Sequence, residues 1–234
     1  MKKLKYSLLL VLSMILFSVP VLAAKTYYLP SKMEGNIIDK EYAYDKKGHM
    51  IKYHDDENDV NQTWKYTYDK NGKRVSGKEY FAGELQAELT FDNKQYLKTS
   101  KYVEYGVEMA FKWNKEGYIV SSGGGKADPK YTYYFKDGKL KKSAYYRWGM
   151  KQKVSYYDKN GLLSKTTSSG STTTYEYKFN KNGLVTTIIK KTTDEDGKKS
   201  TEKINVTYSK TKTDQKTYAL FINGFDTCYS NALL

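Results

Sequence analysis

The sequence predicts an all-β fold, an antiparallel meander of about seven β-hairpin repeats of ~22–23 residues that forms a twisted, curled single sheet. The first observation is a motif, aromatic-x-aromatic-Asp/Asn-x-x-Gly, that returns seven times at intervals of 21 to 24 residues. The second is a series of glycines about halfway between these motifs, where each further strand would need a turn. The third is composition: 25 tyrosines, with fewer than a fifth of the residues Leu, Ile, Val or Phe, favour a thin, half-solvated sheet.

The first element, residues 1–23, is predicted to be a secretory signal peptide. Met1–Ser7 carries three lysines, Leu8–Leu22 is almost wholly apolar, and small residues precede a cleavage point after Ala23 or Ala24. This order is typical of secretory signals; the alternative is an uncleaved N-terminal anchor. The formal net charge of +14 falls to +11 when those lysines are removed. We therefore expect a bacterial protein that is secreted or associated with the cell envelope, with no membrane span after cleavage.

The next elements are the hairpin repeats, which fill residues 42–209. The copies are Tyr42–Gly48, Tyr66–Gly72, Leu89–Gln95, Phe111–Gly117, Tyr133–Gly138, Tyr156–Gly161 and Tyr177–Gly183, with a degenerate eighth at Val206–Tyr208. An Asp or Asn at the start of a turn accepts backbone N–H bonds, and the glycine takes positive φ. The predicted turn formers are Asp45, Gly48, Asp69, Gly72, Gly117, Gly138, Asp158, Gly161 and Gly183. Gln95 stands where the third glycine belongs and predicts a looser or mis-registered turn.

The aromatic positions of the motif supply the candidate binding residues. Residues two apart in a strand share a face, so stacked repeats should place these rings in a ladder down one face of the sheet. The candidates are Tyr42, Tyr44, Tyr66, Tyr68, Trp113, Tyr133, Phe135, Tyr157, Tyr177 and Phe179. Aromatic faces can stack on sugar rings, and the surrounding lysines attract phosphate, carboxylate or sulfate.

The remaining elements are two predicted caps, because the terminal repeats of such an array must cover an open edge. Residues 24–41 form the N-terminal capping segment, with a strand starting at Tyr27–Pro30. Residues 210–234 form a C-terminal capping hairpin, in which Thr217–Ile222 and Phe225–Tyr229 flank a tight Asn-Gly turn. Cys228 is either a buried small hydrophobe or the site of an intermolecular bridge.

The motif resembles two families of repeat proteins. Tyr66-Thr-Tyr-Asp-Lys-Asn-Gly72 is similar to the YD repeat of bacterial exported and polymorphic-toxin (Rhs-like) proteins. Tyr134–Leu140 and Tyr156–Leu162 are equally similar to the MORN-variant repeat. Both resemblances imply successive β-hairpins. The first also implies carbohydrate-linked surface functions, and the second implies scaffolding with partner or lipid contact.

Several classes of function are disfavoured. Two histidines, His49 and His54, and one cysteine cannot supply a structural zinc site or a disulfide framework. The acidic runs Asp55–Asp59 and Asp194–Gly197 fit solvated turns better than calcium loops. The glycine-rich stretch Gly123–Pro129 fits a long hairpin loop, with a functional loop as the alternative. No nucleophile motif accompanies the histidines, so we expect no enzyme activity, no metal and no cofactor.

The predicted function is that of a non-catalytic exported repeat protein that presents a binding surface for cell-envelope or host polysaccharide or another anionic polymer. The basic charge and the aromatic ladder carry this prediction. The alternative is a protein-interaction scaffold of the bacterial envelope or host surface. The basic charge has an equally good explanation without a ligand, because lysines also keep a sheet with exposed edges soluble. Nucleic acid is a less favoured partner, because Arg74 and Arg147 are the only arginines for base readout.

Overall fold

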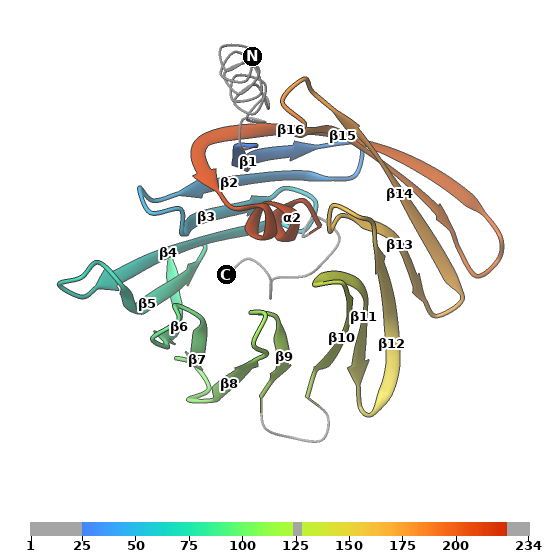
Figure 1. Cartoon of the computed structure of the whole chain (residues 1–234). Helices are drawn as coiled ribbons and strands as arrows, with labels where there is room; N and C mark the ends of the chain where they lie inside the picture. The colour runs from blue at the N-terminus through green and yellow to red at the C-terminus, as the bar shows by residue number, and fades with distance from the viewer. Residues whose placement is uncertain (1–24, 124–127, 224–234) are drawn as a thin grey trace, which may run out of the picture.

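The computed structural model describes residues 25–123 and 128–223, which form a closed antiparallel barrel of 16 strands around a helix, α2 (Figure 1). The strands are β1 (Tyr27–Glu34), β2 (Asp39–Tyr44), β3 (Met50–Asp55), β4 (Val60–Tyr68), β5 (Arg74–Phe81), β6 (Glu84–Phe91), β7 (Leu97–Tyr102), β8 (Glu108–Trp113), β9 (Ile119–Ser122), β10 (Lys130–Lys136), β11 (Lys139–Arg147), β12 (Met150–Tyr157), β13 (Leu163–Ser168), β14 (Ser171–Phe179), β15 (Val185–Thr193) and β16 (Lys199–Thr213), and α2 spans Gln215–Asn223. The predicted signal peptide and Cys228 lie outside the described residues. Within those residues, no helix combines the length and hydrophobicity needed to cross a membrane.

The barrel closes because the first strand pairs with the last, which corrects the prediction of an open, curled single sheet. β1 and β16 pair antiparallel from Tyr27 opposite Thr213 to Glu34 opposite Asn205. The strand predicted as an N-terminal cap is therefore one side of this closing pair. Closure removes the unpaired backbone groups that two free edges would expose.

A β-bulge in every repeat supplies the curvature that brings these edges together. Between β2 and β3, Ala43 pairs with Lys52 and Tyr44 with Met50, so Ile51 is an extra residue on the strand after the turn. The same shift follows six further turns, between β4–β5, β6–β7, β8–β9, β10–β11, β12–β13 and β14–β15. A bulge bends its strand and increases the local twist, so the repetition curves the sheet into a ring.

Except at the shorter turn before Gly138, the Asp or Asn of the motif forms the turn that precedes the bulge. Asp69 Oδ1 accepts the backbone N–H groups of Asn71 and Lys73 at 2.9 and 2.8 Å, and Asp158 does the same at the equivalent turn. The glycines of the motif have φ between +69° and +86°: Gly48, Gly72, Gly117, Gly138, Gly161 and Gly183. Gln95 has φ +72° and donates its N–H to Asp92 O at 3.0 Å. The third turn therefore has the same form as the others, against the expectation of a looser one.

Aromatic side chains of four repeats donate hydrogen bonds to the backbone of the preceding repeat. The Tyr66 hydroxyl donates to Met50 O at 2.8 Å, and the Trp113 indole N–H donates to Leu97 O at 2.8 Å. Tyr133 and Tyr177 make the same bond to the first residue of β9 and of β13, at 2.7 and 2.6 Å. Each acceptor lies at the start of the bulged strand after a turn. The tyrosine-rich composition thus supplies donors to carbonyls in the wall of the barrel.

Helix α2 replaces the first strand of the predicted C-terminal hairpin. Asp214 caps it, because its carboxylate accepts the Thr217 backbone N–H at 2.9 Å and the Thr217 hydroxyl at 2.7 Å. The helix lies inside the ring of strands (Figure 1). Tyr218 and Ile222 belong to one apolar cluster of the interior and Phe221 to the other. The second strand predicted for this hairpin lies outside the described residues.

Candidate functional site

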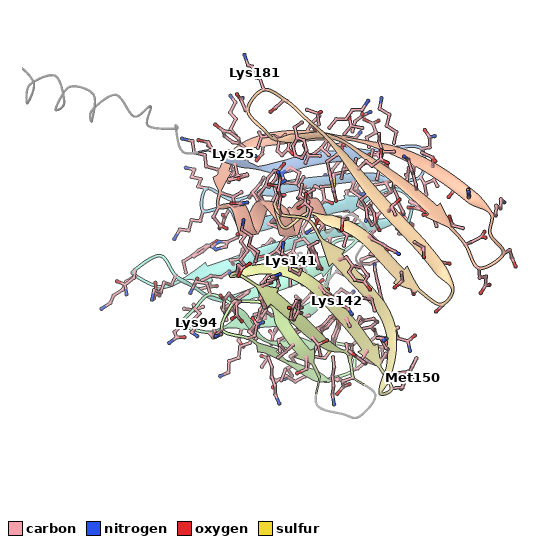
Figure 2. All side chains as sticks on the ribbon, turned by 45° about the vertical axis from the view of Figure 1, so that its right-hand side comes forward. Lys25, Lys94, Lys141, Lys142, Met150 and Lys181 are labelled. Atoms are coloured by element: carbon pink, nitrogen blue, oxygen red, sulfur yellow. The ribbon has the colours of Figure 1, made fainter. Side chains whose placement is uncertain are left out.

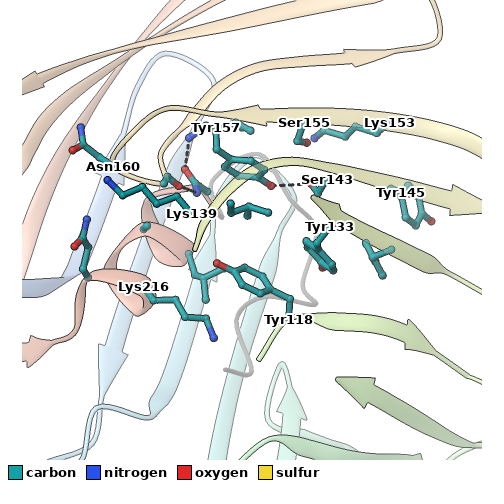
Figure 3. A pocket seen from close by; sticks show the side chains of 18 of the residues that line it. Tyr118, Tyr133, Lys139, Ser143, Tyr145, Lys153, Ser155, Tyr157, Asn160 and Lys216 are labelled. Carbon is teal, nitrogen blue, oxygen red and sulfur yellow. Dashed lines mark hydrogen bonds between the residues drawn. The ribbon is translucent and has the colours of Figure 1, made fainter. Parts of the chain in front are cut away.

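A cavity of about 850 Å³ lies inside the barrel between α2 and the inner face of β10–β13, with Tyr118 from the turn before β9. This volume is within the ~300–1,000 Å³ typical of ligand sites. Side chains that point inward from neighbouring strands line the cavity in rows of register partners. Tyr133 pairs with Ser143, which pairs with Ser155. Figure 3 shows these side chains and those of α2 around the same space.

Basic residues surround this space from several elements. Lys139, Arg147, Lys153, Lys159 and Lys216 all line it, whereas no Asp or Glu is found among the described residues of the lining. Lys139 and Lys159 come from the turn end of the barrel at which α2 lies, and Arg147 and Lys153 from the opposite half of β11 and β12. Basic side chains therefore line both ends of the cavity, and a concave site with this lining concentrates anions.

Tyrosines form the middle of the cavity: Tyr118, Tyr131, Tyr133, Tyr145 and Tyr157. The ring centroids of Tyr118 and Tyr133 are 5.0 Å apart, and those of Tyr131 and Tyr145 are 5.2 Å apart. Burial raises the pKa of the hydroxyls of Tyr118, Tyr133 and Tyr157. These hydroxyls therefore remain neutral, and their rings offer apolar faces between the basic ends.

Lys216 links helix α2 to the wall of the cavity. Its ammonium donates to Glu116 O at 2.5 Å and to Gly117 O at 3.1 Å, and it lies 4.8 Å from the centroid of the Tyr118 ring. Burial lowers the pKa of this lysine, and the charges of Asp214 and Glu116 partly oppose that effect. At the other end of the helix, Asn223 Oδ1 accepts the Leu163 N–H at 2.8 Å. These bonds fix α2 across the cavity.

The structure brings only two of the ten candidate ladder residues, Tyr133 and Tyr157, to this cavity. Tyr42 and Tyr44 share the inner face and contact Phe221 edge-on, with centroid distances of 6.2 and 5.5 Å. The other six do not line the cavity. Four of them contact another ring: Tyr66 contacts Phe91, Tyr68 contacts His49, Trp113 stacks on Tyr96, and Phe135 contacts Tyr118. Tyr177 donates its hydroxyl to Leu163 O, and Phe179 is exposed at the end of β14.

Sequence reasoning missed most of the cavity. The inward serines and the lysines have no motif of their own, and they converge only because strands pair in this register. One sequence signal for the cavity was present, namely the alternation of inward tyrosines with outward residues along the strands. These tyrosines are Tyr131, Tyr133, Tyr145 and Tyr157. Nothing in the pattern indicated the helix that carries Lys216.

Neither histidine belongs to a cluster with metal-binding character, and no group of three or more His, Cys, Asp or Glu suited to a metal occurs in the described part of the chain. His49 Nδ1 lies 2.9 Å from the Tyr68 hydroxyl, which bonds Asp45. In the acidic run, Asp55 pairs with Lys40 at 3.6 Å and accepts the Tyr53 hydroxyl at 2.8 Å. Asp55 Oδ2 therefore has partners within the barrel, whereas Asp55 Oδ1 is buried without a hydrogen-bond partner among the residues that the structure describes.

No family model and no curated protein matches the sequence. Among solved structures, the chain is similar to a porin-like protein from Bacteroides uniformis, with 15% identity over 77% of this chain and 96% of that one, at a TM-score of 0.38. It is also similar to chains of the TcdB2-TccC3-Cdc42 and TcdB2-TccC3 complexes, with 12% and 13% identity over 70% of this chain and a TM-score of 0.34. It spans only 10% of those two chains. Similarities this distant support no inference about function, which we therefore argue from the cavity.

Proposed function

We propose that this protein is a non-catalytic, exported binding protein that holds an anionic saccharide, such as one unit or end of an envelope or host polysaccharide, inside its barrel. The observation that carries the proposal is the lining of the cavity, which combines five basic side chains with five tyrosines and has no acid among its described members. The sequence prediction placed this ligand along a surface ladder. The proposal moves it to the interior.

The chemistry of the cavity suits such a ligand. Tyr131 and Tyr145 pair across β10 and β11, and Lys216 Nζ lies over the Tyr118 ring. Ring faces of this kind pack against the apolar faces of sugar rings, and neutral hydroxyls exchange hydrogen bonds with sugar hydroxyls. The lysines at both ends pair with carboxylate, sulfate or phosphate groups, and charge-assisted hydrogen bonds of this type are the stronger ones.

A pair of identical turns provides the test. Lys159 lies in the turn Asp158-Lys-Asn-Gly161 at the cavity, and Lys70 occupies the same position of Asp69-Lys-Asn-Gly72 elsewhere on the barrel. We would measure binding of oligogalacturonate and of a neutral cello-oligosaccharide to the mature chain by calorimetry. Lys159→Gln should weaken oligogalacturonate binding about tenfold, corresponding to about 1.4 kcal/mol. Lys70→Gln should leave it unchanged. Equal weakening by both variants, or no binding of the acidic probe, would refute the proposal.

A second candidate function is the protein-interaction scaffold, which one surface feature favours. The loop between β7 and β8 exposes Val103, Tyr105 and Val107, with Tyr105 72% exposed. Exposed apolar side chains grouped in this way often mark a protein contact. Replacing all three with serine should abolish any partner captured from envelope extracts while leaving oligogalacturonate binding intact. Retention of every captured protein would count against this function.

A further inference from the structure

The outer face of the barrel carries a continuous row of exposed side chains across seven strands, separate from the cavity. Each member pairs directly with the next across the sheet, and every member is exposed. The row runs Tyr134, Lys142, Tyr156, Lys165, Thr174, Lys191 and Thr201, from β10 to β16. Figure 2 labels Lys142 on this wall. Successive side chains alternate between faces, so this row points away from the cavity residues Tyr133 and Tyr157.

Two of its members are exposed aromatics in the interior of a strand. Tyr134 is 60% exposed and Tyr156 is 37% exposed. Lys142 lies between them in the register, with its ammonium 5.6 Å from the centroid of the Tyr156 ring. Strands lie about 4.8 Å apart, so the backbone positions that carry the two rings are about 10 Å apart, with Lys142 on the strand between them. Lys165 continues the alternation of ring and cation on the next strand.

The opposite wall offers a direct comparison. There, the exposed row of register partners across β4–β8 is Lys65, Lys78, Glu88, Lys101 and Glu108. Lysines and acids alternate in this row from Lys78 to Glu108, as expected of a face that only needs to be soluble. The row from Tyr134 to Lys165 contains no acid and adds two rings. Solubility requires neither feature.

We propose that Tyr134, Lys142, Tyr156 and Lys165 form a surface site for a linear anionic polysaccharide that lies across the strands of β10–β13. The two rings stack on sugar faces, and the two lysines pair with sulfate or carboxylate groups along the chain. Thr174 extends the row with a hydroxyl. Further along, Lys191 is already paired with Glu176, so the charged part of the site ends before it. This site is additional to the cavity of the proposed function and does not depend on it.

The site can be tested with three probes and three double variants. The probes are dextran sulfate, which has sugar rings and charge, dextran, which has rings alone, and polyphosphate, which has charge alone. The variants of the mature chain are Tyr134→Ser with Tyr156→Ser, Lys142→Gln with Lys165→Gln, and the matched control Lys65→Gln with Lys78→Gln. The control removes the same charge from the opposite wall. Affinities are measured over a salt series, and unfolding midpoints confirm that each variant folds.

We expect dextran sulfate to bind more tightly than either other probe. The tyrosine variant should lose at least tenfold affinity for dextran sulfate and none for polyphosphate. The lysine variant should weaken both and reduce the salt slope by about 2, since each lysine releases about one counterion. The control variant should have a clearly smaller effect. Equal loss in control and lysine variants would show diffuse charge and overturn the site, as would unchanged dextran sulfate binding in the tyrosine variant. The tyrosine variant should lose the same factor in affinity in a Lys159→Gln background, because the effects of independent sites add, and this separates the site from the cavity.

Discussion

Phe221→Ala in α2 should lower the free energy of unfolding by about 4 kcal/mol, because this side chain joins the helix to the wall of the barrel. Phe221 is 7% exposed, and Tyr42 and Tyr44 meet its ring at nearly right angles. An aromatic side chain buries about 150–250 Å², and about 25 cal/mol per Å² gives about 4–6 kcal/mol. Alanine keeps the Cβ, which brings the expected loss to the lower end of that range.

The measurement is equilibrium unfolding in urea, followed by circular dichroism and tryptophan fluorescence. Leu220→Ala is the matched control, because Leu220 is the neighbouring residue of the same helix but is only half-buried and faces the cavity. It should lose less than half as much as Phe221→Ala. A loss below about 1 kcal/mol for Phe221→Ala, or equal losses in both variants, would refute the view that α2 is packed into the barrel through this ring.

Three further predictions concern the turns, the aromatic hydroxyls and pH. Asp158→Ala removes the acceptor of two backbone N–H groups and should cost about 1–2 kcal/mol in urea unfolding, whereas Lys159→Ala in the same turn should cost almost nothing. Tyr44→Phe leaves Pro30 O without the hydroxyl at 2.8 Å and should cost about 1 kcal/mol; an unchanged midpoint would contradict that bond. Burial and the charge of Arg74 hold the pKa of His49 below 6.5, against the opposing effect of Asp45. The unfolded chain therefore binds more protons just below that pH, and stability falls as the pH is lowered through 6.5. His49→Gln should lose less stability than the parent between about pH 7.5 and about pH 5.5, and equal losses would exclude His49 as the cause.

The local structure of the repeats was largely accessible from the sequence. The Asp-x-x-Gly pattern specifies a turn through bonds between residues a few positions apart, as at Asp69 and Asp158. The alternation of side chains placed Tyr42 and Tyr44 on one face, where both contact Phe221. Such features depend on neighbours along the chain, so a short motif contains the information that determines them.

The candidate site was much less accessible. Tyr133 and Tyr157 were chosen as members of a ladder, but the other candidate rings support the wall or pack on the helix instead. Lys139, Lys159 and Lys216 line one cavity although they come from the start of β11, a turn and a helix. No short pattern links them, because their proximity depends on the order of the strands and on the position of α2.

The sequence by itself determined the period, the turns, the antiparallel meander and the basic, tyrosine-rich composition. These follow from local hydrogen bonding, from side-chain alternation and from residue counts. Only the tertiary structure decided that the sheet closes, that the segment after Asp214 is a helix and that the basic side chains face one cavity. Closure depends on small bends that add up over the seven repeat bulges, and over further bulges such as those of β5–β6 and β11–β12, until β1 meets β16, roughly 180 residues away along the chain. The total curvature is a property of the whole ring, so the sequence of a single repeat does not determine whether the sheet closes.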